Sequence, residues 1–148
     1  DIDVHHGNGT QDIFWNEPRV MYASSHQSPL YPGTGARGET GVGNIVNAPL
    51  APGAGSAEFH DAYEQALLPA LEAFAPELVL ISAGFDAHRL DPLASLALEA
   101  ADYAWITTRL VELAGRHAQG RVVSSLEGGY SLEALRESSA AHVAALLS

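Results

Sequence analysis

A nearly continuous apolar run, Glu77-Leu78-Val79-Leu80-Ile81-Ser82, is followed directly by Ala83-Gly84-Phe85-Asp86-Ala87-His88. Such a run of β-favouring residues is typical of a central parallel strand that is covered on both faces. Parallel strands need crossover connections, and on either side of the run short β-rich stretches alternate with amphipathic ones. The sequence therefore predicts an α/β domain with a mainly parallel central sheet, and it places Asp86 just past the end of one strand.

The same patterns predict the other elements of the domain. We expect strands that end near Val4 and that cover 19–24, 44–48 and 121–126. We expect helices over 11–15, 56–74 and 98–118, and a terminal helix that Ser131 caps. Pro69 should kink the helix over 56–74. The Gly- and Pro-rich loop over 25–43 is long, and such loops are usually functional.

The amino-acid composition indicates which classes of protein and which kinds of metal site are compatible with this chain. The 148 residues amount to one domain, and 47% apolar against 17% charged residues indicates a globular chain. Seven basic against eighteen acidic residues give a net charge of −11, which argues against binding nucleic acid or an anionic membrane. Without cysteine there is neither a disulfide nor a thiolate metal site, in keeping with a cytoplasmic protein. Any metal must therefore be held by His, Asp or Glu.

Carboxylates and imidazoles gather at the start of the chain, in Asp1-Ile2-Asp3-Val4-His5-His6-Gly7-Asn8-Gly9-Thr10-Gln11. Alternate side chains of a strand point to opposite faces, so Asp1, Asp3 and His5 should point one way and His6 elsewhere. A carboxylate oxygen beside an imidazole nitrogen suits a divalent transition metal such as zinc. The segment is thus a candidate metal site, although a polar strand end with chance histidines would look similar.

Two other strand ends carry reactive groups, and the ends of parallel strands meet at one edge of a sheet. Asp86 is the natural third metal ligand, with capping of the next helix or turn as the alternative. His88 lies two residues further on, where a loop or solvent role fits better than metal binding. Tyr130 follows Gly128 and Gly129, and its phenol could donate a hydrogen bond to a developing oxyanion. Packing at a strand-to-helix junction is the alternative for Tyr130.

Taken together, five motifs resemble the zinc-dependent histone deacetylase family. They are Asp1 to Gln11, Tyr31-Pro32-Gly33-Thr34-Gly35, Ser82-Ala83-Gly84-Phe85-Asp86-Ala87, Asp91-Pro92-Leu93 and Leu126-Glu127-Gly128-Gly129-Tyr130. The match is best to class II and bacterial members, which include acetylpolyamine amidohydrolases and acetoin-utilisation proteins. The resemblance implies a three-layer arginase/deacetylase-like fold. Residues 1–148 would be the C-terminal part of a single such domain.

The resemblance also implies roles for individual residues. Asp3, His5 and Asp86 would bind one Zn²⁺, and Tyr130 would polarise the acyl carbonyl. Asp1 would orient a catalytic histidine through its carboxylate, and His26 would support the site without touching the metal.

A structural potassium ion and a substrate tunnel are implied as well. Main-chain oxygens of Asp1, Asp3 and His5, the Ser24 hydroxyl and the Ser25 carbonyl match the family's potassium site. The tunnel would be lined by Tyr31, by Leu93 at its rim, and by Gly128 and Gly129.

The implied reaction is hydrolysis of the acetyl group from the side-chain amine of lysine. An acidic residue at the position of Leu93 goes with polyamine selectivity in one branch of the family, so Leu93 favours acyl-lysine over acetylpolyamine. The family's general base is one of two adjacent histidines well upstream of this motif, and His5-His6 is not that pair. We therefore expect the 148-residue chain to be inactive or nearly so, and to expose a sheet edge and apolar surface.

Two alternatives stay open at this point. A binuclear manganese hydrolase of the arginase type would need further bridging carboxylates near the first motif. A non-catalytic relative that binds acetylated ligands would keep the fold without turnover. The natural substrate, whether acetyl-lysine, acetylpolyamine or another N-acyl amine, and the oligomeric state are not set by these residues.

Overall fold

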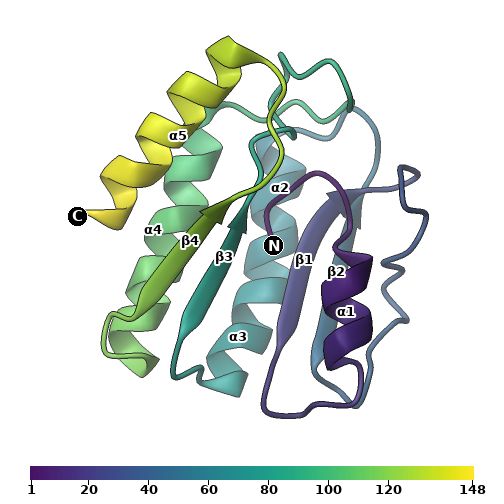
Figure 1. The fold of residues 1–148 in the computed structure, drawn as a ribbon, viewed down its shortest axis with the longest axis vertical. Helices are drawn as coiled ribbons and strands as arrows, with labels where there is room; N and C mark the ends of the chain where they lie inside the picture. The colour runs from purple at the N-terminus through teal and green to yellow at the C-terminus, as the bar shows by residue number, and fades with distance from the viewer.

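The computed structural model describes residues 1–148 and contains two parallel strand pairs. Strand β1 (Tyr22–Gln27) pairs with β2 (Ile45–Leu50), and β3 (Val79–Ala83) pairs with β4 (Val122–Leu126). The first residues of the chain lie between the pairs (Figure 1). The Ile2 N–H donates to the Ser82 carbonyl at 3.0 Å, and the Gln27 N–H donates to the Val4 carbonyl at 2.9 Å. The opening segment therefore links β1 to β3 at their C-terminal ends.

Helices cover the strands mainly from one side. Helix α2 (Ser56–Ala62), a π-helical turn (Tyr63–Leu67) and α3 (Leu68–Phe74) run on continuously, and with α4 (Ala100–His117) they lie behind the strands in Figure 1. Helix α5 (Leu132–Leu146) packs on α4, and α1 (Asn8–Phe14) lies on the other side, near β1. The largest apolar side chains of the core are fully buried between these layers: Val4, Phe59, Leu67, Leu98, Tyr103, Ile106 and Leu113.

Most predicted element types agree with the structure, but the strand predicted to end near Val4 is absent, because residues 1–7 form a bend, and several boundaries differ. The strand predicted over 19–24 begins three residues later, at Tyr22, and the first helix begins earlier, at Asn8. The helix predicted over 56–74 is present, but its irregularity is a π turn that precedes Pro69 rather than a kink at the proline. Because α3 continues from this turn, Pro69 lies within one continuous helix, and its missing N–H leaves a carbonyl of the preceding turn without its usual donor. Ser131 caps α5 as expected, accepting a hydrogen bond from the Ala134 N–H.

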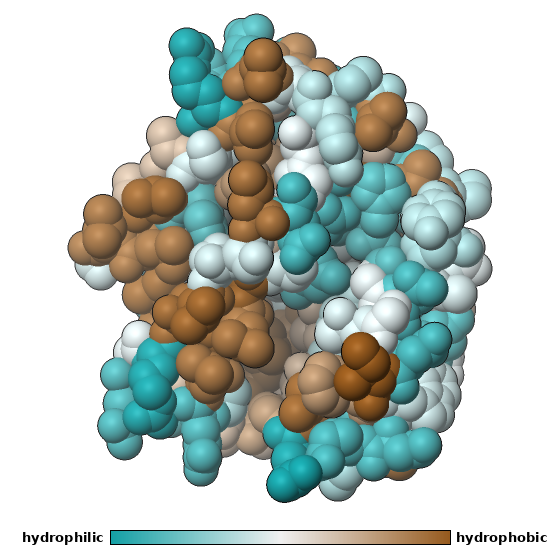
Figure 2. All heavy atoms as spheres, viewed as in Figure 1, coloured by the Kyte–Doolittle hydropathy of each residue, from teal (hydrophilic) through white to brown (hydrophobic).

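The prediction that β3 is covered on both faces is wrong. Val79, Ile81 and Ala83 are buried, but Leu80 is 68% exposed, and its cross-strand partner Val123 is 55% exposed. The helices α2 to α4 cover only the face that carries the buried residues. Apolar residues on the other face belong to the brown area of the surface in Figure 2. An apolar cleft of about 350 Å³ opens beside them, between β1 and β3.

One histidine of the terminal helix is buried. His142 of α5 lies between Thr107 of α4 and Ser124 of β4, at 2.6 Å and 2.8 Å from their hydroxyl oxygens. His60 of α2 and His117 at the end of α4, by contrast, are half-buried. No helix of the structure has the length and apolarity to cross a membrane.

Candidate metal centre and active site

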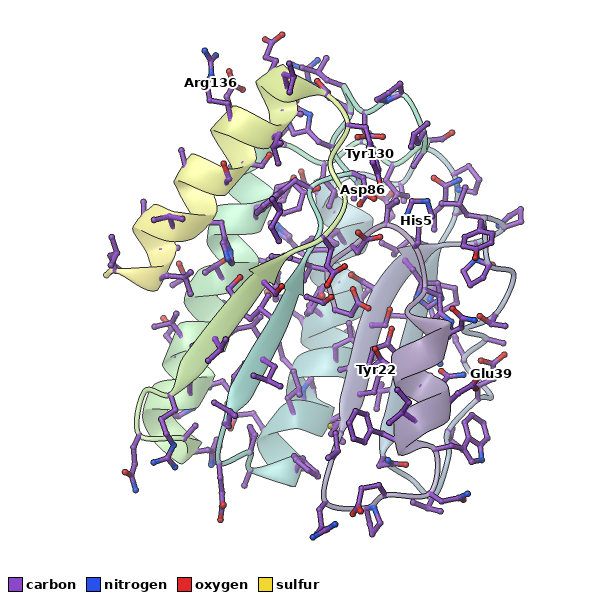
Figure 3. All side chains as sticks on the ribbon, viewed as in Figure 1. His5, Tyr22, Glu39, Asp86, Tyr130 and Arg136 are labelled. Carbon is purple, nitrogen blue, oxygen red and sulfur yellow. The ribbon has the colours of Figure 1, made fainter.

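The structure brings Asp3, His5 and Asp86 together at the C-terminal ends of the strands. Their ligand atoms all lie within 4.8 Å of one another. His5 Nδ1 is 3.0 Å from Asp3 Oδ1 and 3.2 Å from Asp86 Oδ2. The Asp3 Oδ1 atom also accepts the His5 backbone N–H at 2.8 Å, which curls the chain so that both side chains face the same point. Figure 3 shows His5 and Asp86 converging there.

Asp86 is the buried member of the cluster. Its Oδ1 accepts the Val4 N–H at 2.8 Å, while its Oδ2 accepts no hydrogen bond although the residue is fully buried. Burial, and then the nearby charge of Asp3, raise the pKa of Asp86 to about 6. A buried carboxylate oxygen without a donor, beside a second carboxylate, is relieved by a divalent cation. The capping alternative for Asp86 is not what the structure shows, because its contacts run to Val4 and His5.

Two glycines make room for this cluster. A Cβ atom at Gly84 would overlap the Asp3 carboxylate, and one at Gly128 would overlap the carboxylates of Asp86 and Asp3. The Gly128 N–H donates to Asp3 Oδ2 at 2.9 Å, and its carbonyl accepts the Phe85 N–H at 2.8 Å. The donor set of one imidazole and two carboxylates, closely cradled by backbone, fits a zinc ion and leaves positions open for water and substrate.

Tyr130 lies beside the cluster on the loop that follows β4, as Figure 3 shows. Its side chain is 56% exposed, so neighbouring side chains do not enclose it. Desolvation, and then the charges of Asp86 and Asp3, raise the pKa of the phenol above its usual value. The hydroxyl therefore stays protonated at neutral pH and is available as a hydrogen-bond donor. Packing at the junction, the alternative considered for Tyr130, does not account for a side chain this exposed.

Asp1 lies behind the ligands, and a residue that the sequence analysis did not single out holds it there. The Tyr22 hydroxyl donates to Asp1 Oδ2 at 2.9 Å, and Asp1 Oδ1 accepts the Asp3 N–H at 3.1 Å. The same Tyr22 oxygen accepts the Gly7 N–H at 2.8 Å. Tyr22 looked like an ordinary strand residue, and nothing in its local pattern indicated this contact.

His6 and His26 point away from the cluster and pack on each other, with ring centroids 4.8 Å apart. His6 contacts the Thr34 hydroxyl at 2.7 Å and Gln11 Oε1 at 2.9 Å. His26 Nε2 donates to the Gly35 carbonyl at 2.9 Å, and burial, and then the nearby His6, lower its pKa to about 4. His6 thus turns elsewhere as predicted. His6 ties the loop over 28–43 to the opening segment, and His26 ties it to β1.

Other predicted site residues take these places. Tyr31 is on the loop over 28–43, with its ring centroid 6.4 Å from that of His5, and it is largely exposed. Leu93 is exposed on the loop between β3 and α4. Gly129, beside Gly128, has a φ of 139°, which favours glycine. His88 is buried in that β3–α4 loop and is not one of the clustered ligands.

The residues of the predicted potassium site lie on the opening segment and β1. The Asp1 carbonyl accepts the Ser25 N–H at 3.3 Å, and the Ser24 hydroxyl contacts His26 Nδ1 at 3.0 Å. Asp1 and Ser25 are therefore in contact, and a potassium ion among the five residues stays a prediction.

A buried aspartate, Asp91, binds backbone N–H groups of two loops at the candidate site. Asp91 Oδ2 accepts the Tyr130 N–H at 2.8 Å, and Asp91 Oδ1 accepts the Leu93 N–H at 2.9 Å. Asp91 belonged to a recognised motif, but the sequence assigned it no role because its partner Tyr130 is 39 residues away along the chain.

Comparisons with known proteins agree with this site. The histone deacetylase domain profile matches residues 1–146. The chain is 47% identical over 137 residues to a protein of Archaeoglobus fulgidus named "Probable deacetylase", covering 90% of the chain and 38% of that protein. It is 43% identical over 142 residues to "Histone deacetylase 10, chloroplastic" of Oryza sativa, covering 93% of the chain and 32% of that protein.

A solved structure agrees as well. The crystal structure of the HDA15 HD domain superposes with a TM-score of 0.93 at 41% identity, over 99% of this chain and 42% of that one. The chain thus spans well under half the length of the proteins that it matches. The fold is the α/β arginase/deacetylase-like fold, and the chain belongs to the histone deacetylase family.

Proposed function

We propose that this chain forms the zinc-binding and oxyanion-stabilising part of a deacetylase that hydrolyses the acetyl amide of lysine side chains. The observation that carries the proposal is the cluster of Asp3, His5 and Asp86 with the unpartnered, buried Asp86 Oδ2 at its centre. Membership of the histone deacetylase family supports it. The exposed, apolar Leu93, which Asp91 joins to Tyr130, suits the aliphatic chain of an acyl-lysine better than a polyamine, which is cationic.

The residues divide the chemistry among them. Zinc, when bound, supplies a Lewis acid and lowers the pKa of a water nucleophile. Asp3, His5 and Asp86 would hold the ion, and Gly84 and Gly128 keep the space around it free of side chains. The Tyr130 hydroxyl would donate to the acyl oxygen as negative charge develops on it. Tyr31 and Leu93 would flank the entering acyl-lysine chain.

The general base and its proton transfer are proposed to come from another part of a complete deacetylase domain. His5 is committed to the metal cluster, and His6 is bound to Thr34 and Gln11, so neither imidazole is free for this task. The 148-residue chain by itself should therefore bind zinc but hydrolyse acetyl-lysine slowly or not at all.

The test is a substrate panel on a protein that carries this segment within a complete deacetylase domain. We expect turnover of an acetyl-lysine peptide in preference to acetylpolyamine, loss of turnover on chelation, and recovery with Zn²⁺. Tyr130→Phe should lower kcat by about 100-fold or more, as loss of one oxyanion donor does elsewhere. Preference for acetylpolyamine would overturn the substrate assignment. Full activity of Tyr130→Phe, or restoration only by two Mn²⁺ per chain, would overturn the mechanism.

A further inference from the structure

The position of Tyr130 is set by its backbone rather than by its side chain. The side chain is 56% exposed, and its hydroxyl has no hydrogen-bond partner within the chain. Its neighbour Gly129 has a φ of 139°. Glycine adopts many backbone conformations, so hydrogen bonds to the flanking residues must fix the orientation of Tyr130. The contacts of the turn over 128–130 therefore decide where the phenol points.

Three hydrogen bonds hold this turn. Two act at Gly128, whose N–H donates to Asp3 and whose carbonyl accepts the Phe85 N–H. The third acts at Tyr130 itself, whose N–H donates to Asp91 Oδ2 at 2.8 Å. Only the third bond acts on the Tyr130 backbone itself, between Gly129 and the Ser131 cap at which α5 begins.

Asp91 is well placed to act as a rigid anchor. The residue is 7% exposed, and its carboxylate accepts two backbone N–H groups with one oxygen each. Its own N–H donates to the His88 carbonyl at 2.9 Å. Hydrogen bonds to an ionised acceptor are stronger than neutral ones, and two of them restrict both the position and the rotation of the carboxylate.

The second N–H that Asp91 accepts belongs to Leu93, two residues further along the same loop. One carboxylate thus joins the loop that carries the rim residue Leu93 to the loop that carries Tyr130. We propose that Asp91 is a positioning residue, which holds the Tyr130 hydroxyl in reach of the acyl oxygen and fixes its spacing from Leu93. This inference rests on the proposed function, in which Tyr130 is the oxyanion donor.

The test compares Asp91→Asn with a matched variant in a protein that carries the complete domain. Asp102→Asn is the control, because Asp102 is also buried and also accepts a backbone N–H, from Glu99 at 2.8 Å, but at the start of α4. Asp91→Asn should lower kcat by roughly 10- to 100-fold with KM nearly unchanged, since misplacing a reacting group by about 1 Å costs up to about 100-fold. Asp102→Asn should lower the melting temperature but leave kcat within about twofold. Unchanged kcat in Asp91→Asn would overturn the inference.

A double-variant cycle separates positioning from general damage to the fold. If Asp91 acts through Tyr130, adding Asp91→Asn to Tyr130→Phe should cost less than about twofold in kcat, whereas an independent effect would multiply. Multiplicative losses contradict the inference. If Tyr130→Phe alone is fully active, it is the proposed function that fails.

Amide hydrogen exchange tests the inference on the unmodified protein, so its result does not depend on whether a variant folds. The Tyr130 and Leu93 amides should be protected to a similar degree, because one buried carboxylate binds both. Exchange of the Tyr130 amide at the rate of an unstructured peptide would contradict the inference.

Discussion

At the scale of single residues, the candidate metal centre depends on the half-buried carboxylate of Asp3 and the buried carboxylate of Asp86. Asp3 and His5 were paired from the sequence by the alternation of a strand, but residues 1–7 form a bend, and the two side chains converge because Asp3 Oδ1 accepts the His5 N–H. Asp86 could be assigned because it follows a recognisable strand. The roles of Asp91 and Tyr22 could not be assigned, because their partners are distant in sequence and nothing local marks the contact.

The unpartnered oxygen of Asp86 leads to a prediction about metal binding. Asp86→Asn should weaken Zn²⁺ binding by more than about 100-fold. Substituting a residue that only hydrogen-bonds to a ligand already lowers metal affinity by about 10- to 100-fold, and loss of a ligand should lower it further. The metal-free variant should be at least as stable as the unmodified chain. An Asn side chain keeps the bond to the Val4 N–H and removes a buried charge.

Calorimetric titration with Zn²⁺ and thermal unfolding of the metal-free proteins check both parts. Asp61→Asn is the control, because Asp61 is an exposed carboxylate outside the cluster and its loss should change neither quantity. Equal Zn²⁺ affinity of Asp86→Asn and the unmodified chain would contradict the assignment of this ligand.

At the scale of elements, helix type and order follow from local patterns, but burial of polar residues does not. The Ser131 cap and the amphipathic run of α4 are local signals. The sequence pattern of α5 alone would place His142 at the boundary between the core and the surface. It is buried because α4, β4 and α5 meet around it, and each supplies part of its surroundings.

The surroundings of His142 specify one neutral form. The Thr107 hydroxyl donates to the Tyr103 carbonyl at 2.6 Å, so His142 Nδ1 must donate to Thr107. His142 Nε2 is then the acceptor for the Ser124 hydroxyl. The ring of Phe85 also packs against His142, so no carboxylate among these neighbours compensates a positive charge.

This arrangement predicts how stability changes with pH. Burial lowers the pKa of His142 from 6.5, so at pH values between the two the folded protein binds fewer protons than the unfolded chain. The contribution of His142 to the free energy of unfolding is therefore complete above pH 6.5 and decreases as the pH falls toward the lowered pKa.

Urea unfolding of the metal-free chain across this range measures the effect. Other histidines also titrate. We therefore compare the free energy of unfolding of the unmodified chain with that of His142→Gln, whose side chain cannot be protonated. That difference should shrink as the pH falls below 6.5. A difference independent of pH would show that His142 is not held neutral.

At the scale of the whole molecule, one face of the β3–β4 pair has no covering layer. Leu80 and Val123 are directly opposite each other across the strands, and both also line the apolar cleft between β1 and β3. Contiguous apolar surface of this kind favours association. We therefore expect the 148-residue chain to self-associate as its concentration rises.

Sedimentation or light scattering over a concentration series tests this expectation. Leu80→Lys combined with Val123→Thr should shift the chain toward monomer, while both residues remain exposed and the core is untouched. Leu147→Lys is the control, because Leu147 is 82% exposed beyond α5 and outside the cleft. A chain that remains monomeric without these changes would contradict the prediction.

The sequence by itself determined the α/β class and the order of the elements, because each depends on spacing within short segments, while the three clustered residues were implied by the resemblance of its motifs to a known family. Only the tertiary structure decided which strand face is covered, that His142 is buried, and that Asp91 joins Leu93 to Tyr130. These features depend on which distant segments meet. Burial and hydrogen bonding between such segments arise from tertiary contacts, and the local sequence of either segment does not indicate them.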